Sequence, residues 1–409
     1  MTAAEPVPAL RRNRNFSLLL SGSAVSVLGD RFALMAYPLL VLGETGSPAA
    51  AGWVGFAGAL PAFLFYLPAA PFVERWDPRR TMGACEACRG LAVLFIVASL
   101  VKGAVAVPAL AAAACFEGAF ATVYSLAEVK MIRAVVPSAQ TSTALAGNEA
   151  RNSVASLVGR PFGGFLYGLG RAVPFLADVI SFVISVTTLL LIRLAPRPQQ
   201  PNPVPAPEQP MTLTGIGQGF RCVRSDRYMR AIIPLMAISN LIIQALYVVF
   251  IASAKAHGTS SAVIGVAFAA TGIGGILGAA TASRLFRWCG YRLLPMAQWV
   301  WVAAMSPLLV TVNEYTFGAA LTVMAMTGVA VNVSAGTYFY QRIPEEMLAR
   351  VMSVDLLAEY AAAAAGPLAG GLLVTGLGGP ASAAVLAGLA AVLAAIATSV
   401  KDVRTPPRA

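Results

Sequence analysis

The feature that most constrains the fold is a recurrence of long apolar segments. Twelve stretches rich in Leu, Val, Ala and Phe run from Phe16 to Val400, with short polar segments between them. A helix of about 20 residues, rising about 1.5 Å per residue, crosses a hydrocarbon core about 30 Å thick. The sequence therefore predicts an all-α membrane protein. The predicted spans cover residues 16–42, 52–73, 82–101, 105–129, 144–169, 173–193, 229–253, 261–283, 293–312, 315–339, 351–376 and 380–399.

The composition excludes most other classes of protein. Only 11% of the residues are charged, whereas soluble domains carry about 25%. A net charge of +11 on a soluble chain would suggest nucleic-acid binding, but most of the 29 Lys and Arg residues lie on one side of the predicted membrane. The positive-inside rule then places both termini in the cytoplasm. We therefore expect a multi-pass protein of the cell membrane, with the lipid bilayer and not nucleic acid as its partner.

No motif indicates a cofactor, a metal or an enzymatic site. The chain has no Walker-type glycine-rich loop, so we do not expect ATP to be the energy source. Cys85 and Cys88 have the spacing of a metal or redox motif, but no second pair and no His lies near them. We interpret both as small packing residues within a span. With no catalytic constellation at either membrane face, we do not expect an enzyme.

A proline-rich segment divides the chain into two halves. Residues 195–211 read APRPQQPNPVPAPEQPM, a composition typical of an extended, unpacked linker. Residues 212–230 after it read as a short amphipathic helix with a basic side, which suits anionic lipid headgroups; ordinary linker sequence is the alternative. The expected domains are a six-helix bundle over 1–194, the linker with its short helix over 195–228, and a second six-helix bundle over 229–409.

The two halves repeat each other. The segment GRPFGG at 159–164 is echoed by GPLAGG at 366–371, about half a chain later. Self-similarity of this kind identifies repeat architectures. Two repeated bundles are typical of secondary transporters, whose substrate site lies between the repeats.

Several motifs resemble one family of transporters. They are NFSLLL at 15–20, VLGDR at 27–31, ETGSP at 44–48, ERWDPRR at 74–80 and PEEMLARVMS at 344–353. With them the chain resembles the major facilitator superfamily, and more narrowly its macrolide-efflux and enterobactin-exporter-like branch. The resemblance covers nearly the whole chain. It implies twelve transmembrane helices in two pseudo-symmetric six-helix bundles around a central cavity, and it names no substrate. We expect a monomer.

The loop after the second span carries part of that resemblance. The family signature there is G-x-x-x-D-R-x-x-R-R, in which this chain has Ala70 for the glycine and Glu74 for the aspartate. By resemblance the loop is a charge latch, in which a carboxylate meets guanidinium groups and favours one conformation. The alternative is a basic loop of solvated charges. The latch candidates are Glu74, Arg75, Asp77, Arg79 and Arg80.

Span five resembles the family's antiporter signature, G-P-x-x-G-G. The matching residues are Gly159, Pro161, Gly163 and Gly164, with Arg160 inserted before the proline. Small residues allow close helix approach and proline loosens the backbone, which suits a helix that rocks. Generic packing of a membrane helix is the alternative. Arg160 requires a partner or water, because a guanidinium is costly within the bilayer.

The intramembrane charges are the main candidate site. Asp30 and Glu117 lie near the midpoints of the first and fourth spans, which by resemblance face the cavity. A carboxylate at that depth must be protonated, paired or hydrated. We predict that Asp30 and Glu117 form a proton- or substrate-coupling centre, with Arg31 as the competing cation. The rival interpretation is a structural cluster in which Arg31 neutralises a nearby acid.

Other charged residues within the spans are secondary candidates. They are Glu149, Arg160, Asp178 and Asp355. Glu86 and Arg89 are three residues apart on one helix, so we expect them to form a local pair.

These observations favour a proton-coupled exporter of a small amphipathic molecule, such as a drug or a secondary metabolite. Aromatic residues in the second, seventh and tenth spans suit a bulky apolar or cationic compound. A proton-independent facilitator or importer is an alternative of the same class. A membrane scaffold or receptor that transports nothing is an alternative of another class.

Overall fold

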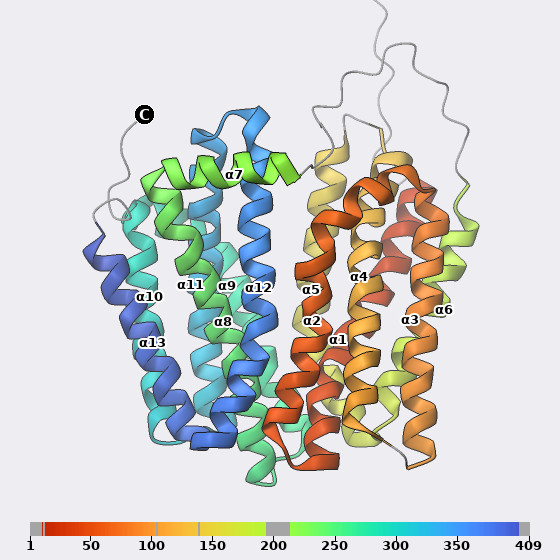
Figure 1. Ribbon diagram of the computed structural model, residues 1–409, viewed down its shortest axis with the longest axis horizontal. Helices are drawn as coiled ribbons and strands as arrows, with labels where there is room; N and C mark the ends of the chain where they lie inside the picture. The colour runs from red at the N-terminus through yellow and green to blue at the C-terminus, as the bar shows by residue number, and fades with distance from the viewer. Residues whose placement is uncertain (1–9, 11–12, 104, 138–139, 194–212, 401–409) are drawn as a thin grey trace, which may run out of the picture.

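Long helices make up nearly all of the part of the chain that the computed structural model describes, which is residues 10, 13–103, 105–137, 140–193 and 213–400. The first bundle contains α1 (Arg14–Thr45), α2 (Pro48–Arg75), α3 (Pro78–Val101), α4 (Val107–Val135), α5 (Thr141–Leu169) and α6 (Val173–Leu191). The second contains α8 (Arg227–Ala256), α9 (Ser261–Cys289), α10 (Leu293–Met305), α11 (Glu314–Arg342), α12 (Glu345–Leu377) and α13 (Gly379–Ser399). Figure 1 shows the two bundles side by side, as the sequence predicts.

In the described part of the chain, ten segments are long and apolar enough to cross a membrane. Two features explain why there are ten such segments where the sequence predicts twelve spans. The helices α9 and α10 continue through short 3₁₀ turns into one apolar segment, Ser261–Leu309. The helix α5 is not among the ten, because Glu149, Arg151 and Arg160 lie along it. The least apolar helix of the first bundle is thus one that carries candidate site residues.

Polar caps set the helix ends outside the apolar stretches. Asn13 accepts a hydrogen bond from the backbone N–H of Phe16 at 3.1 Å, and Asp77 accepts one from Arg80 at 2.8 Å. Such caps satisfy backbone donors that the first helical turn leaves unpaired. Several helices therefore begin a few residues before the predicted spans.

The short helix α7 (Leu213–Ser225) connects the bundles, within the range predicted for an amphipathic helix. It ends early because Asp226 caps α8 and accepts hydrogen bonds from the backbone N–H groups of Tyr228 and Met229 in its first turn. Gly219 lies against the backbone of Arg350 at the start of α12, and Arg350 donates to the Gln218 side chain. Residues 195–211, the predicted linker, lie outside the described residues.

We name the two ends of the molecule by these elements. The proximal end carries α7 and the first residues of α1, and the distal end carries the α1–α2 and α12–α13 turns (Figure 1). Near the distal end the bundles meet through close backbone contacts. A Cβ at Gly164 would lie 2.8 Å from the Cα of Gly265, and one at Gly371 would lie 3.0 Å from the Cα of Gly52. From these contacts the bundles separate toward the proximal end in Figure 1.

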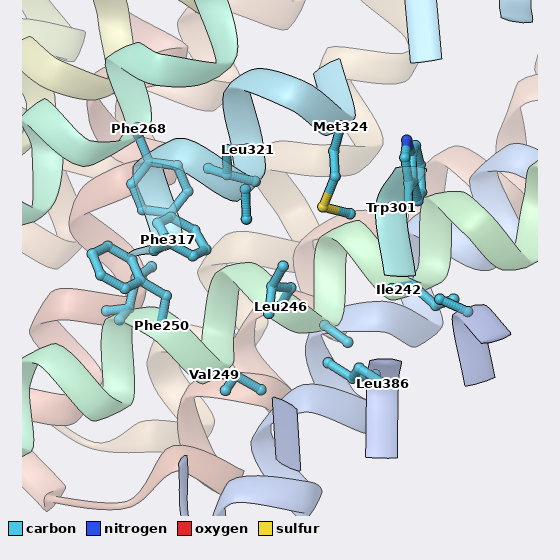
Figure 2. Close-up of a cluster of buried hydrophobic side chains, with 14 of the residues drawn as sticks. Ile242, Leu246, Val249, Phe250, Phe268, Trp301, Phe317, Leu321, Met324 and Leu386 are labelled. Atoms are coloured by element: carbon cyan, nitrogen blue, oxygen red, sulfur yellow. The ribbon is translucent and has the colours of Figure 1, made fainter. Parts of the chain in front are cut away.

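The second bundle has an aromatic core (Figure 2). The rings of Phe250 and Phe317 stack with centroids 3.7 Å apart, and Phe268 meets Phe317 edge-on at 5.4 Å. Trp301 lies among the same buried residues and donates to Thr327 at 2.8 Å. Such pairs add specific geometry to apolar packing. This core fixes the side of the second bundle that faces the first.

Candidate functional site

A central cavity of about 290 Å³ lies between the bundles, lined by residues from both. Most of its wall is apolar, formed by residues such as Leu34, Met35, Val54 and Ile251. The polar part of the wall is small and mostly charged. It consists chiefly of Asp30, Arg31, Arg89, Glu117, Arg160 and Gln244. An apolar cavity with a few placed polar groups is the usual form of a small-molecule site.

Arg89 of α3 is the centre of a buried charge cluster on one side of this cavity. Its guanidinium contacts Asp30 of α1 in a short ion pair, and its Nη2 lies 3.7 Å from Oε1 of Glu117 on α4. Its Nη1 lies 3.8 Å from Oε2 of Glu86, one turn earlier on α3. The ring of Phe182 faces the guanidinium at 4.5 Å. One cation therefore joins three helices.

Hydroxyl groups complete the cluster. Tyr37 donates to Oε2 of Glu117 at 2.7 Å, and Ser185 donates to Oε1 of Glu86 at 2.7 Å. Asp178 of α6 is fully buried, and its Oδ2 has no hydrogen-bond partner among the described residues. Ligand oxygens of Asp30, Glu117 and Asp178 all lie within 4.8 Å of one another. We call Asp30, Glu86, Arg89, Glu117 and Asp178 the acid cluster.

The charges of the acid cluster do not balance. Four carboxylates surround the guanidinium of Arg89. Of these five side chains, that of Asp30 is the most exposed, with 27% of its surface accessible. In a low-dielectric interior such an excess of negative charge persists only if protons or another cation neutralise it. The arrangement is therefore able to take up and release a positive charge beside the cavity.

The structure brings together Asp30, Glu117 and the secondary candidate Asp178. The cation in contact with Asp30 and Glu117 is Arg89, which the sequence analysis assigned only to a local pair with Glu86. The i,i+3 pair exists, but its 3.8 Å separation is longer than the contact with Asp30. Arg89 could have been found by comparing how deep each charged residue lies in its predicted span. Spacing along one helix does not show which residues of different spans lie at the same depth.

Arg31 lies on the cavity wall beside α5. A side chain at Gly159 would overlap the Cβ of Arg31, so the glycine allows α1 and α5 to touch there. Arg160, the next residue on α5, also lines the cavity. Its guanidinium lies 4.7 Å from the ring of Tyr247 and 5.7 Å from that of Phe268. Two arginines thus lie on the same wall, close to where α1 and α5 meet.

A second buried ion pair lies nearer the proximal end. Arg151 of α5 binds Glu128 of α4 through two contacts, of 2.6 and 3.2 Å, and also donates to Ser23 of α1. Neither member lines the central cavity. The bidentate geometry and the bonds to three helices fit a structural role.

One further secondary candidate lies in the second bundle and is not part of the acid cluster. Asp355 of α12 is buried, with Oδ1 unpaired among the described side chains. The side chain of Glu149 lies outside the described residues.

In this conformation the loop between α2 and α3 is held by backbone contacts. Asp77 caps α3, and Lys130 donates to the carbonyls of Glu74 at 2.5 Å and Trp76 at 2.6 Å. Arg79 donates to the carbonyl of Leu190 at 2.6 Å. Among the described residues the Glu74 carboxylate forms no ion pair. The charge latch therefore stays a prediction, because in the described part of the chain Asp77 and Arg79 bind backbone groups and no ion pair involves Arg75 or Arg80.

The glycines of the antiporter-like motif lie at two interfaces. Gly159 and Gly163 face α1, where a Cβ at Gly163 would lie 2.9 Å from the Cα of Phe32, and Gly164 faces α9. The repeated glycines of α12 behave alike, since Gly366 and Gly370 face α8 and Gly371 faces α2. The motif with Pro161 therefore packs each helix both within its own bundle and against the other one.

The family model of the Major Facilitator Superfamily matches residues 19–354. The chain belongs to this superfamily, and it is a multi-pass membrane transport protein rather than an enzyme. A comparison with curated protein sequences gave no match.

Solved structures of transporters are similar over nearly the whole chain. A bacterial homologue of the iron transporter ferroportin in its inward-facing state has a TM-score of 0.72 at 13% identity, covering 96% of this chain and 100% of that one. A bacterial homologue of the human lysosomal transporter Spinster, inward-facing and unoccupied, has a TM-score of 0.68 at 16% identity, covering 98% and 96%. The nucleoside transporter NupG has a TM-score of 0.69 at 12% identity, covering 94% and 98%. At these identities the likeness shows the fold alone.

Proposed function

We propose that this protein is a secondary active transporter that exports a small amphipathic molecule in exchange for protons. The acid cluster is the observation that carries the proposal. It holds more carboxylates than cations, it is buried, and two of its acids, Asp30 and Glu117, open onto the central cavity. A proton taken up there and a positively charged group of the substrate would compete for the same carboxylates. Competition of this kind couples the two fluxes in opposite directions.

The proposed direction of transport and the proposed orientation in the membrane are inferred from the sequence. The motifs quoted above resemble the macrolide-efflux and enterobactin-exporter-like branch, and the positive-inside rule puts the proximal end in the cytoplasm of the cell. With that orientation the conformation is closed outside and open inside. The inward-facing states of the ferroportin and Spinster homologues are consistent with this assignment.

A susceptibility panel tests the proposal. We expect a pump-deficient bacterial host that overproduces the protein to tolerate at least one amphipathic compound better than a host with an empty vector. A proton ionophore should abolish the difference in accumulation of that compound. Transport that persists with the ionophore would instead indicate a facilitator, and accumulation that rises with the protein would indicate an importer. No transport of any compound would indicate a scaffold or receptor.

A divalent cation is a second candidate cargo. The close oxygens of Asp30, Glu117 and Asp178 favour it, and two of the similar structures are a homologue of an iron transporter and a bacterial metal transporter. The position of Arg89 argues against a divalent cation more strongly than against a singly charged group, since its guanidinium already contacts Asp30 and Glu117 and repels a double charge about twice as strongly. Uptake of Mn²⁺ or Fe²⁺ into proteoliposomes separates the two cargoes, and we expect none above protein-free vesicles.

A further inference from the structure

Arg160 is a cation whose described surroundings contain no acid partner. Among the described residues its guanidinium contacts aromatic rings, those of Tyr247 and Phe268 from the other bundle, and forms no ion pair. Ring faces attract the charge but accept few of the five N–H donors of a guanidinium. The side chain is half-buried and is among the residues that line the cavity, so an acid group of a molecule bound there is able to reach its donors.

The opposite charge lies nearby on the same wall. Asp30, the partly exposed acid of the acid cluster, precedes Arg31 on α1, and Arg31 contacts α5 at Gly159, the residue before Arg160. The cavity wall therefore carries the carboxylates of Asp30 and Glu117, which Arg89 also contacts, and the guanidinium of Arg160, while Arg31 lines it where α1 meets α5. We call Asp30 with Glu117 the negative pole and Arg160 the positive pole. The remaining wall is largely apolar.

We propose that the substrate is a compact zwitterion, with an ammonium group, a carboxylate or phosphate group and an apolar body. The ammonium group binds at Asp30 and Glu117, and the acid group binds the guanidinium of Arg160. Arginine suits this role because its planar fork binds carboxylate and phosphate through paired hydrogen bonds. The apolar body packs against Leu34, Met35 and Val54.

A singly charged substrate fits the cavity less well. A simple amine leaves Arg160 without an anion in a low-dielectric wall, where an unpaired guanidinium is costly. A simple acid approaches carboxylates that carry excess negative charge. The zwitterion satisfies both poles at once, and its ammonium group retains the competition with protons on which the proposed function rests.

The size of the cavity limits the zwitterion to a small molecule. A volume of about 290 Å³ lies near the lower end of the range of about 300–1,000 Å³ for small-molecule pockets. A single aromatic amino acid or a molecule of similar size meets this limit.

Three matched probes test the inference by equilibrium binding to the purified protein. L-Phenylalanine carries both charges, phenethylamine lacks the carboxylate, and 3-phenylpropanoate lacks the amine. We expect L-phenylalanine to bind at least about tenfold more tightly than either single-charge probe, because charge-assisted hydrogen bonds contribute that much or more. Phenylalanine phosphonate, 1-amino-2-phenylethylphosphonate, then tells whether phosphorus oxyacids bind better than carboxylates.

Variants assign each pole. Arg160→Gln should lower the preference for L-phenylalanine over phenethylamine to about twofold or less without weakening phenethylamine binding, whereas Arg160→Lys should retain part of the preference. Asp30→Asn should weaken both amine-bearing probes and spare 3-phenylpropanoate. Arg171→Gln, which removes an exposed ion pair with Glu44 away from the cavity, is the matched control and should change none of these affinities.

The outcome separates this inference from the proposed function. Binding of L-phenylalanine no tighter than phenethylamine, or an unchanged preference in Arg160→Gln, would overturn the zwitterion. A wild-type protein that exports a simple cation in a proton-dependent manner would keep the proposed function and overturn the zwitterion. Tight, Arg160-dependent binding of the zwitterion without proton-driven flux would support the substrate class. It would contradict the proposed coupling of transport to protons.

Discussion

The two bundles share one architecture but differ in what they bury. The interior of the first contains Glu86, Arg89, Glu117 and Asp178, all from helices around the cavity wall. The second places stacked phenylalanines, Trp301 and Met324 at its centre (Figure 2). The first bundle therefore buries a network of charged side chains, whereas the second buries mainly apolar side chains, with Asp355 as a buried acid.

Equivalent positions show how the halves diverged. Gly159 and Gly366 are repeat counterparts, and a Cβ at each would meet a side chain of the first helix of its own bundle, Arg31 in one case and Gln244 in the other. Both side chains line the cavity. A guanidinium on one side and a neutral amide on the other show that the packing was retained at this pair of positions while the charge was not.

The largest expected effect comes from removing the central cation of the first bundle. Arg89→Met leaves four carboxylates, three of them buried, without their guanidinium, which should cost about 3–5 kcal/mol of stability. In the second bundle Gln298 is buried and donates to Ser239 at 2.7 Å. Gln298→Met should cost only about 1–2 kcal/mol, since it removes a neutral hydrogen bond. Thermal unfolding of the purified variants measures both.

A compensation experiment controls for loss of packing around Arg89. Asp30→Asn and Glu117→Gln, added to Arg89→Met, should restore part of the lost stability, because they remove the uncompensated charge. No recovery, or equal losses for Arg89→Met and Gln298→Met, would mean that charge does not distinguish the two interiors.

The second prediction concerns a feature that the bundles share. Gly164→Leu and Gly371→Leu each place a side chain against the other bundle's backbone near the distal end, at Gly265 and Gly52. Overpacking of this kind costs about 1–3 kcal/mol and should shift the population toward a conformation open at the distal end. Distances between spin labels at the proximal ends of the bundles should shorten in both variants.

Two further glycines serve as matched controls for this shift. A Cβ at Gly168 or Gly376 would meet nothing within 4 Å, and both lie on the same helices, α5 and α12. Gly168→Leu and Gly376→Leu should therefore leave the distance distribution unchanged. A shift produced by only one of the two interface variants would show that the distal contact is not symmetric.

The smallest expected effect on stability comes from the loop of the first bundle. Asp77→Lys removes the cap of α3 and should cost about 0.5–2 kcal/mol, and Glu74→Lys should cost less because its side chain is exposed and unpaired among the described residues. Both variants should impair transport more than stability if the loop is a latch. Normal transport of both at normal expression would reduce the loop to a topology signal.

The sequence predicted the fold because the fold depends on properties that a sequence displays directly. Length and apolarity define the spans, and the repeated glycine motifs define the pairing of α5 with α12 as counterparts. Span limits were less accurate, because capping residues such as Asn13 lie in polar sequence beyond the apolar stretch.

The site was predictable only in part. Asp30 and Glu117 were identifiable because carboxylates at mid-span are rare and costly. Arg89 was not, since its nearest acid in sequence, Glu86, offered a local partner and concealed contacts with α1 and α4. The contact of Arg160 with Tyr247 likewise depends on how the two bundles pack against each other. The spacing of residues along one helix does not reveal that packing.

The central claim is that the acid cluster of the first bundle couples transport to protons. Its most direct test compares two fluxes of one substrate in proteoliposomes, uphill transport driven by a pH gradient and downhill exchange without one. In the double variant Asp30→Asn with Glu117→Gln, at wild-type thermal stability, we predict that uphill transport is lost and that part of the downhill exchange remains. Full pH-driven transport in the double variant would contradict the account.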